Sequence, residues 1–254
     1  MMLLAGIQKV TLLDYPGEVA CTVFTRGCNL RCPFCQNPDL VVPELCARKE
    51  PYPEEEFFQY LTKRRGRLSG VAVSGGEPTL HADLPEFLGR IRELGYKVKL
   101  DTNGMRPEAL CRILGERLAD YVAMDVKNSP EKYALTCGRF PEDDETALKG
   151  SRAAEVWEYA RESISLLMEG SVPYEFRTTV VDGLHTLEDI EEMARHLSGA
   201  RAWYLQQFTG REMLVASYLG DGKSPALSAP SAADLWRMKA AAQKSVPHVS
   251  VRGV

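Results

Sequence analysis

Three cysteines within eight residues are the part of this sequence most directly suited to chemistry. They are Cys28, Cys32 and Cys35, in the spacing C-x-x-x-C-x-x-C. Thiolates are the usual ligands of iron–sulfur clusters, so these three can bind three irons of a four-iron cluster. The fourth iron then has no protein ligand from the motif and can bind a further molecule. The spacing therefore predicts a cluster that takes part in chemistry.

Two other kinds of metal site compete with this interpretation. A structural zinc ion needs four ligands, commonly supplied by two C-x-x-C pairs, and Cys21 or Cys46 could provide the fourth sulfur. A cluster that only transfers electrons also usually has four thiolates. We expect Cys21, Cys46, Cys111 and Cys137 to be buried apolar side chains or bystanders instead.

The composition is that of an ordinary globular protein. The chain has 254 residues, of which 44% are hydrophobic and 26% charged, with a net charge of −4. It contains no apolar run near the roughly 18 residues that span a bilayer, and we expect no membrane association. The seven cysteines, odd in number and without an export signal, predict a cytoplasmic protein without a disulfide framework. The chain has no overall excess of basic residues, so its charge does not indicate a nucleic-acid partner.

The elements that must position the cysteines alternate between strands and helices. This alternation predicts right-handed βαβ units around a parallel sheet. A closed eight-fold barrel usually takes about 250 residues, so six units and a tail predict an α/β fold, a partial (β/α)6 TIM-like barrel open on one side. We expect one domain over 1–254, with a core at about 18–208 and a C-terminal extension at 209–254. The six strands are predicted at 19–25, 70–74, 98–101, 121–127, 174–181 and 202–207.

Further elements follow from local signals. Apolar residues at 1–6 predict a first strand, and residues 249–251 a short last one. Asp83 with Glu86 predicts a capping pair, and Thr186 a helix cap. The acidic stretch at 142–150 predicts a surface loop. Helices are predicted at 52–65, 84–94, 107–115, 153–168, 187–197 and 231–243.

Each predicted strand ends in polar residues, and in such barrels the carboxyl ends of the strands carry the active site. Because side chains alternate between the two faces of a strand, Asp125 and Lys127 share one face, and Glu175, Arg177 and Thr179 share another. The polar ends are the cysteine loop, Gly75-Gly76-Glu77-Pro78, Asp101-Thr102-Asn103-Gly104, Asp125 with Lys127, Arg177, and Gln206-Gln207.

The loop after the second of these strands is suited to binding an ammonium group. Gly75 and Gly76 allow a ligand to approach the backbone closely. Glu77 and the backbone carbonyls can accept hydrogen bonds from the ammonium. Asp101-Thr102-Asn103-Gly104, considered alone, could equally be a helix cap.

Together these residues resemble the radical S-adenosylmethionine (SAM) superfamily over nearly the whole chain. Phe34 supplies the aromatic side chain that typically precedes the third cysteine of that superfamily. Within it, the chain is most similar to glycyl-radical-enzyme activases, and among these to activating proteins of anaerobic ribonucleoside-triphosphate reductase. The stretches that carry this resemblance are 13–17, 101–104, 124–127, 174–181 and 206–208.

The resemblance implies a [4Fe-4S] cluster held by the three cysteines, with the unique iron taking the amino and carboxylate groups of SAM. Phe34 would lie near the adenine. The amino group would be held by Gly75, Gly76 and Glu77, and the rest of SAM would be contacted by Asp125, Lys127 and Arg177.

In related activases, aspartates that match Asp101 and Asp125 help to hold a monovalent cation, so the resemblance also implies a cation site. Two positions depart from many relatives: Gln36 stands in place of His, and Asp182 in place of Pro. Both departures weaken the assignment of the substrate.

The implied activity is reductive cleavage of SAM to a 5′-deoxyadenosyl radical, which takes a hydrogen from one glycine of a partner enzyme. A flavodoxin or ferredoxin would donate the electron. A second hypothesis keeps this chemistry but replaces the glycine with a small molecule, such as a pterin-derived precursor of deazapurines. A third is a zinc-stabilised binding module.

Overall fold

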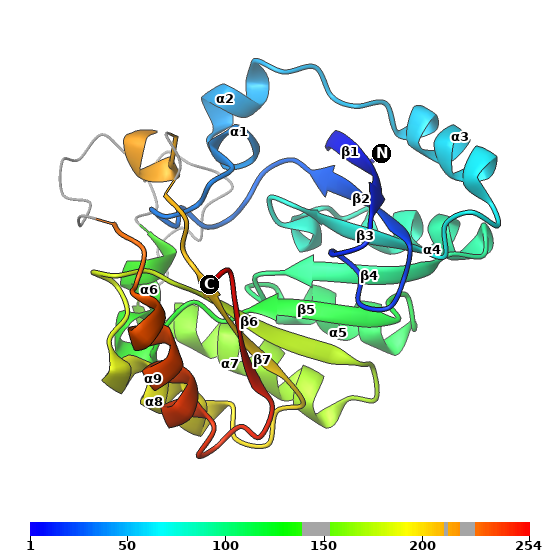
Figure 1. The fold of residues 1–254 in the computed structure, drawn as a ribbon. Helices are drawn as coiled ribbons and strands as arrows, with labels where there is room; N and C mark the ends of the chain where they lie inside the picture. The colour runs from blue at the N-terminus through cyan, green and yellow to red at the C-terminus, as the bar shows by residue number, and fades with distance from the viewer. Residues whose placement is uncertain (139–152, 211–212, 219–226) are drawn as a thin grey trace.

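The computed structural model describes residues 1–138, 153–210, 213–218 and 227–254, so the acidic stretch expected at 142–150 lies outside the described residues. Within these ranges, eight strands form one sheet in the order of the chain (Figure 1). The strands are β1 (Leu4–Thr11), β2 (Ala20–Thr25), β3 (Gly70–Gly75), β4 (Lys97–Thr102), β5 (Tyr121–Asp125), β6 (Tyr174–Val180), β7 (Trp203–Gln207) and β8 (Val249–Arg252).

The sheet is an open, partial barrel, as predicted. The six predicted strands are β2 to β7, and all of them run parallel. β8 continues the parallel order beside β7, whereas β1 is antiparallel to β2. β1 and β8 form the two edges and do not pair with each other in the described residues, which leaves one side open (Figure 1).

Helices follow the strands in the βαβ pattern, and every predicted helix is present. α1, α2 and α6 were not predicted; each begins with a proline, which fits the first turn of a helix because its missing N–H needs no partner there. None of the helices in the described ranges is long and apolar enough to cross a membrane. The helices are α1 (Pro38–Val41), α2 (Pro43–Ala47), α3 (Glu54–Arg64), α4 (Leu84–Glu93), α5 (Pro107–Gly115), α6 (Pro130–Cys137), α7 (Ala153–Glu169), α8 (Leu187–His196) and α9 (Ala232–Ala242), with 3₁₀ turns η1 (Pro78–Leu80) and η2 (Val215–Tyr218).

The C-terminal extension contributes to the barrel itself. Its strand β8 pairs with β7, and α9 packs beside α8 and against β7 and β8. Val249 and Leu235 are both buried, so this segment shares the apolar core with the preceding strands. The assignment of the whole chain to one domain stays a prediction.

The two predicted helix caps have different outcomes. Thr186 caps α8 in a capping box with Asp189, in which the hydroxyl and the carboxylate each accept a hydrogen bond from the other residue's backbone N–H. Asp83 is the N-cap of α4, but its side chain accepts no capping hydrogen bond. The predicted capping pair is therefore wrong, because the Asp83 carboxylate pairs with the ammonium of Met1 instead.

Thr186→Ala should lower the free energy of unfolding by about 1 kcal/mol, because it leaves an N–H at the start of α8 without its capping partner. Asp83→Ala is the matched control and should leave the free energy of unfolding nearly unchanged, since the exposed ion pair with Met1 contributes little. Urea unfolding monitored by circular dichroism measures both. Equal losses for the two variants would contradict the difference between the caps.

Candidate functional site

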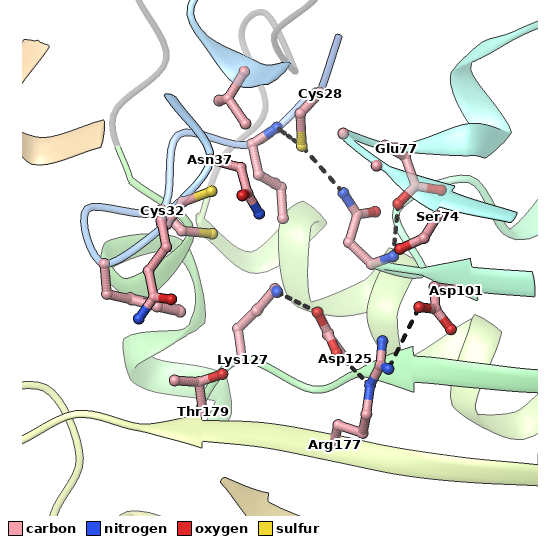
Figure 2. A pocket seen from close by; sticks show the side chains of 18 of the residues that line it. Cys28, Cys32, Asn37, Ser74, Glu77, Asp101, Asp125, Lys127, Arg177 and Thr179 are labelled. Carbon is pink, nitrogen blue, oxygen red and sulfur yellow. Dashed lines mark hydrogen bonds and ion pairs between the residues drawn. The ribbon is translucent and has the colours of Figure 1, made fainter. Parts of the chain in front are cut away.

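A cavity of about 350 Å³ opens where the parallel strands end (Figure 2). The structure brings every predicted site residue to its wall, although they are spread over 150 positions of the chain. This convergence follows from the parallel order of β2 to β7, which places their carboxyl ends on one rim. The residues are Cys28, Cys32, Phe34, Cys35, Gly75, Gly76, Glu77, Asp101, Asp125, Lys127 and Arg177.

The cysteine loop between β2 and α1 is held by the buried Arg31. Its guanidinium donates to the backbone oxygens of Cys28, at 2.6 Å, and Leu30, at 2.9 Å. Its backbone N–H donates to the carbonyl of Cys137 at 2.9 Å, which fastens the loop to the end of α6. The loop is therefore positioned by protein contacts that do not involve the thiols.

The thiols of this loop are in buried surroundings. Burial raises the pKa of Cys28, and raises the pKa of Cys35 to about 11. A side-chain hydrogen bond with Cys137 lowers the pKa of Cys32. Cys137 was expected to be a buried apolar side chain or a bystander; it is buried, but its spacing from the motif gave no signal of this contact. Metal must displace protons from such thiols when it binds.

The surroundings of the cysteines include a donor that suits an iron–sulfur cluster. In the described parts of the chain, no three His, Cys, Asp or Glu side chains are grouped so as to hold one metal ion. The buried amide nitrogen of Asn29, next to Cys28, is a donor without an acceptor among the described residues. The sulfur atoms of a cluster are acceptors that such a donor can use.

Gly75 and Gly76 were expected to let a ligand approach the backbone closely. In the structure, the segment that approaches them is the protein's own backbone at the end of β2 and just after it. A Cβ on Gly76 would lie 1.8 Å from the oxygen of Gly27, and one on Gly75 would lie 2.2 Å from the nitrogen of Thr25. The N–H groups of Gly76 and Glu77 donate to the carbonyls of Thr25 and Gly27, at 3.0 and 2.8 Å. The glycines thus join the loop after β3 to the segment that leads into the cysteine loop.

The Glu77 carboxylate lies at the cavity wall but is fully engaged by protein donors. It accepts from the hydroxyl and the backbone N–H of Thr79, from the hydroxyl of Thr102 at 2.7 Å, and from the backbone N–H of Asn103 at 2.7 Å. Burial raises the pKa of Glu77 despite these donors. Its contact with an ammonium group stays a prediction.

Charged side chains of alternating sign cross the cavity floor (Figure 2). Lys99, 2% exposed, pairs with Asp101. Arg177 lies 3.5 Å from Asp101 and 3.0 Å from Asp125, which in turn lies 2.9 Å from Lys127. Burial alone would raise the pKa of Asp125, but Lys127 and Arg177 outweigh it and hold this pKa at about 2. Lys99 does not line the cavity, but with it the row has three cations against two carboxylates, and this net positive charge suits a carboxylate ligand.

The predicted alternation on β6 is confirmed by these contacts. Arg177 and Thr179 line the cavity. Glu175, on the same face, is buried one step further from the mouth, where it accepts from Tyr121 at 3.1 Å and pairs with Arg252 at 3.3 Å. Arg252 belongs to β8 and was not predicted to take part.

Gln36 and Asp182, the two positions that depart from the family pattern, both contact the C-terminal extension. The Gln36 amide donates to the carbonyl oxygen of Thr209 at 2.5 Å. Asp182 exchanges a backbone and a side-chain hydrogen bond with Ser228. The N–H groups of Val215 and Ala216 donate to the carbonyls of Cys35 and Pro33. The extension therefore covers one flank of the cysteine loop.

Comparisons with known proteins agree with this geometry. A protein-family model described as "Radical SAM superfamily" matches residues 22–197. The chain is 30% identical over 255 residues to a Methanocaldococcus jannaschii protein described as a candidate glycyl-radical enzyme activating enzyme, covering 99% of this chain and 96% of that one. It is 28% identical over 223 residues to 7-carboxy-7-deazaguanine synthase of Methanopyrus kandleri, covering 78% and 77%.

Among solved structures, the fold is similar to that of Streptococcus suis SuiB bound to S-adenosylmethionine, with a TM-score of 0.58 and 16% sequence identity. The match covers 89% of this chain and 48% of SuiB, so the chain spans about half the length of that protein. At this identity the likeness concerns the fold alone.

Gly76→Ala should destabilise the metal-free protein by about 2–3 kcal/mol, because the new Cβ would overlap the backbone oxygen of Gly27. Gly89→Ala, in α4, is the control: no atom lies within 4 Å of the added Cβ, and the change should stabilise by about 0.5–1 kcal/mol. Urea midpoints measure both effects. A Gly76→Ala protein as stable as the unsubstituted one would refute the close contact.

Proposed function

We propose, from the premise that this chain belongs to the radical SAM superfamily, that it generates a glycyl radical on a partner enzyme. The observation that carries the chemistry is that three cysteines of one loop share a cavity with Lys127, Arg177 and the loop after β3. The relative that matches over 96% of its length supports the activase assignment within that superfamily.

In this proposal Cys28, Cys32 and Cys35 bind three irons of a [4Fe-4S] cluster, and Phe34, which is buried at the cavity wall, lies beside the adenine of SAM. When bound, the cluster and SAM supply reductive cleavage to methionine and a hydrogen-abstracting 5′-deoxyadenosyl radical. The chain's own part is to position these groups and to exclude water.

The strand-end residues hold the two charged groups of the methionine moiety. The backbone carbonyls of Gly75, Gly76 and Glu77 accept hydrogen bonds from the ammonium group. Lys127 and Arg177 orient the carboxylate, and Asp125 fixes both cations by its ion pairs with them. A charged ligand in a cavity of this size needs such partners on each side.

The open side of the barrel supports a macromolecular substrate, because a glycine on a loop of another protein must reach the cavity. We propose anaerobic ribonucleoside-triphosphate reductase as this partner and a flavodoxin or ferredoxin as the electron donor, on the resemblance of the sequence. A cytoplasmic location belongs to the same proposal.

A second candidate is a small-molecule substrate of the deazapurine-precursor type. The similarity to 7-carboxy-7-deazaguanine synthase supports it, as do the polar side chains of Gln206, Gln207 and Thr209 at the cavity. The near-complete coverage of the glycyl-radical relative favours the first candidate.

Anaerobically reconstituted protein should contain about four irons and, with SAM and a reductant, release 5′-deoxyadenosine. Cys32→Ala should abolish the release, whereas Cys111→Ala should not, because Cys111 is exposed on α5 and lies away from the cavity. Chromatography of the products measures this. Absence of 5′-deoxyadenosine from the four-iron protein would rule out the proposed chemistry.

Addition of the partner reductase should then give a glycyl radical signal in electron paramagnetic resonance. Conversion of a deazapurine precursor, with no radical on the reductase, would instead select the second candidate.

The resemblance implied a bound monovalent cation. We also propose that the charged side chains of Lys99, Lys127 and Arg177 take the place of this ion. Asp101 is paired with Lys99 and Arg177, and Asp125 with Lys127 and Arg177, so each carboxylate already has two positive partners. Lys99 is buried at the base of the row and leaves Asp101 no unpaired charge to offer to an ion.

The affinity for SAM should therefore be the same, within about two-fold, in potassium chloride and in choline chloride. Lys99→Met removes one positive charge, so its affinity should fall by about ten-fold in choline and recover in potassium. Equilibrium binding of SAM to the reconstituted proteins measures this, with iron content as a check on folding. A strong potassium requirement in the unsubstituted protein would overturn the proposal.

A further inference from the structure

Asn103 lies between the loop after β3 and the first cysteine, and all its contacts point to one orientation. Its backbone N–H donates to Glu77 at 2.7 Å. Its side-chain nitrogen donates to Asn29 Oδ1 at 2.8 Å and lies 3.7 Å from Cys28 Sγ, within hydrogen-bonding range for sulfur. Its side-chain oxygen accepts from the N–H of Met105 at 3.0 Å.

These partners settle which end of the amide faces the cysteine. The N–H of Met105 can only donate, so the oxygen of the Asn103 amide must face it. The nitrogen therefore faces Cys28 and Asn29, and a flipped amide would place two donors against each other. Figure 2 shows the line of contacts that runs from Glu77 to Cys28.

The contact lies at the cavity wall but is largely shielded from solvent. Asn103 is 6% exposed, Cys28 8% and Asn29 1%. A hydrogen bond to a charged group is stronger in such surroundings than in water, because little solvent screens it. The backbone N–H of Leu30 approaches the same sulfur at 3.4 Å, so Cys28 is the target of two N–H dipoles.

We propose that Asn103 is a positioning residue that sets the reduction potential of the cluster through its N–H contact with Cys28 Sγ. Hydrogen bonds to the sulfur ligands of an iron–sulfur cluster are one of the determinants of its potential. The N–H dipole stabilises negative charge on the thiolate, and this charge is larger in the reduced cluster. Asn103 thus raises the potential and makes the cluster easier to reduce. The inference rests on the proposed function, since it requires that Cys28 binds a cluster.

Glu77 supports the contact between Asn103 and Cys28 indirectly. By accepting from the backbone N–H of Asn103 and the hydroxyl of Thr102, it fixes the loop that carries the amide. The acidic residue of the Gly-Gly-Glu-Pro loop therefore acts on the cysteine side of the cavity through Asn103.

The test compares the midpoint potentials of reconstituted variants, measured in the absence of SAM by redox titration followed by electron paramagnetic resonance. Asn103→Leu has a similar size but no donor, so its potential should shift to a more negative value than that of the unsubstituted protein. Asn103→Asp keeps the acceptor for Met105 but faces the sulfur with a carboxylate, so its shift should be larger.

Ser163→Ala is the matched control. Ser163 donates to the carbonyl oxygen of Gly104 at 2.7 Å and supports the same loop without touching a cysteine. The cluster of the Ser163→Ala protein should have the same midpoint potential as that of the unsubstituted protein. This control separates the effect of a loosened loop from the effect of losing the N–H contact.

Only Asn103 variants that retain four irons are compared. If such a variant has the same midpoint potential as the unsubstituted protein, the inference is overturned. So would a shift of Ser163→Ala equal to that of Asn103→Leu. An unsubstituted protein that holds the cluster but releases no 5′-deoxyadenosine would reject the proposed function while leaving the ordered series of potentials intact, so the two failures are distinguishable.

Discussion

A charge removed from water must be matched by neighbouring charges or hydrogen-bond donors, and this constraint organises the interior of the barrel. Glu77 is matched by four donors from Thr79, Thr102 and Asn103. The row from Lys99 to Lys127 is matched by alternation of sign. The contacts of Arg177 with Asp101 and Asp125, and of Glu77 with Thr102, join different segments of the barrel, so they also fix the strand ends relative to one another.

This matching divides the cavity into two functional halves. On the cysteine side, neutral N–H donors from Leu30 and Asn103 approach Cys28. On the opposite side, the ammonium of Lys127 and the guanidinium of Arg177 alternate with carboxylates. A ligand with a carboxylate at one end and an electron acceptor at the other would be oriented by this difference alone, before any contact specific to its shape.

The sequence predicted the fold and the members of the site well, because both depend on local patterns. Strand periodicity and βαβ alternation located β2 to β7, and the polar residues at their ends are the residues that line the cavity. The partners of those residues could not be predicted. Glu77 turns its carboxylate to Thr102 and Asn103 because of how the loops after β3 and β4 pack together, which no spacing in the sequence records.

Side-chain competition accounts for the remaining differences. Asp83 has the residue type and position of a helix cap, but the ammonium of Met1, distant in sequence, takes its carboxylate. Cys137 and Gln36 carry no motif of their own, and their contacts with Cys32 and Thr209 exist only because α6 and the C-terminal extension pack beside the cysteine loop.

The antiparallel direction of β1 has a practical consequence for how the protein can be handled. Leu4 pairs with Thr25 and Arg252 pairs with Gln206, so the first strand starts, and the last strand ends, at the rim that bears the cavity. An affinity tag or fluorescent label on either terminus would therefore stand next to the mouth that a partner must enter. The exposed turn at 116–117, which follows α5 and precedes the start of β5 at the opposite rim, is the better place for immobilisation.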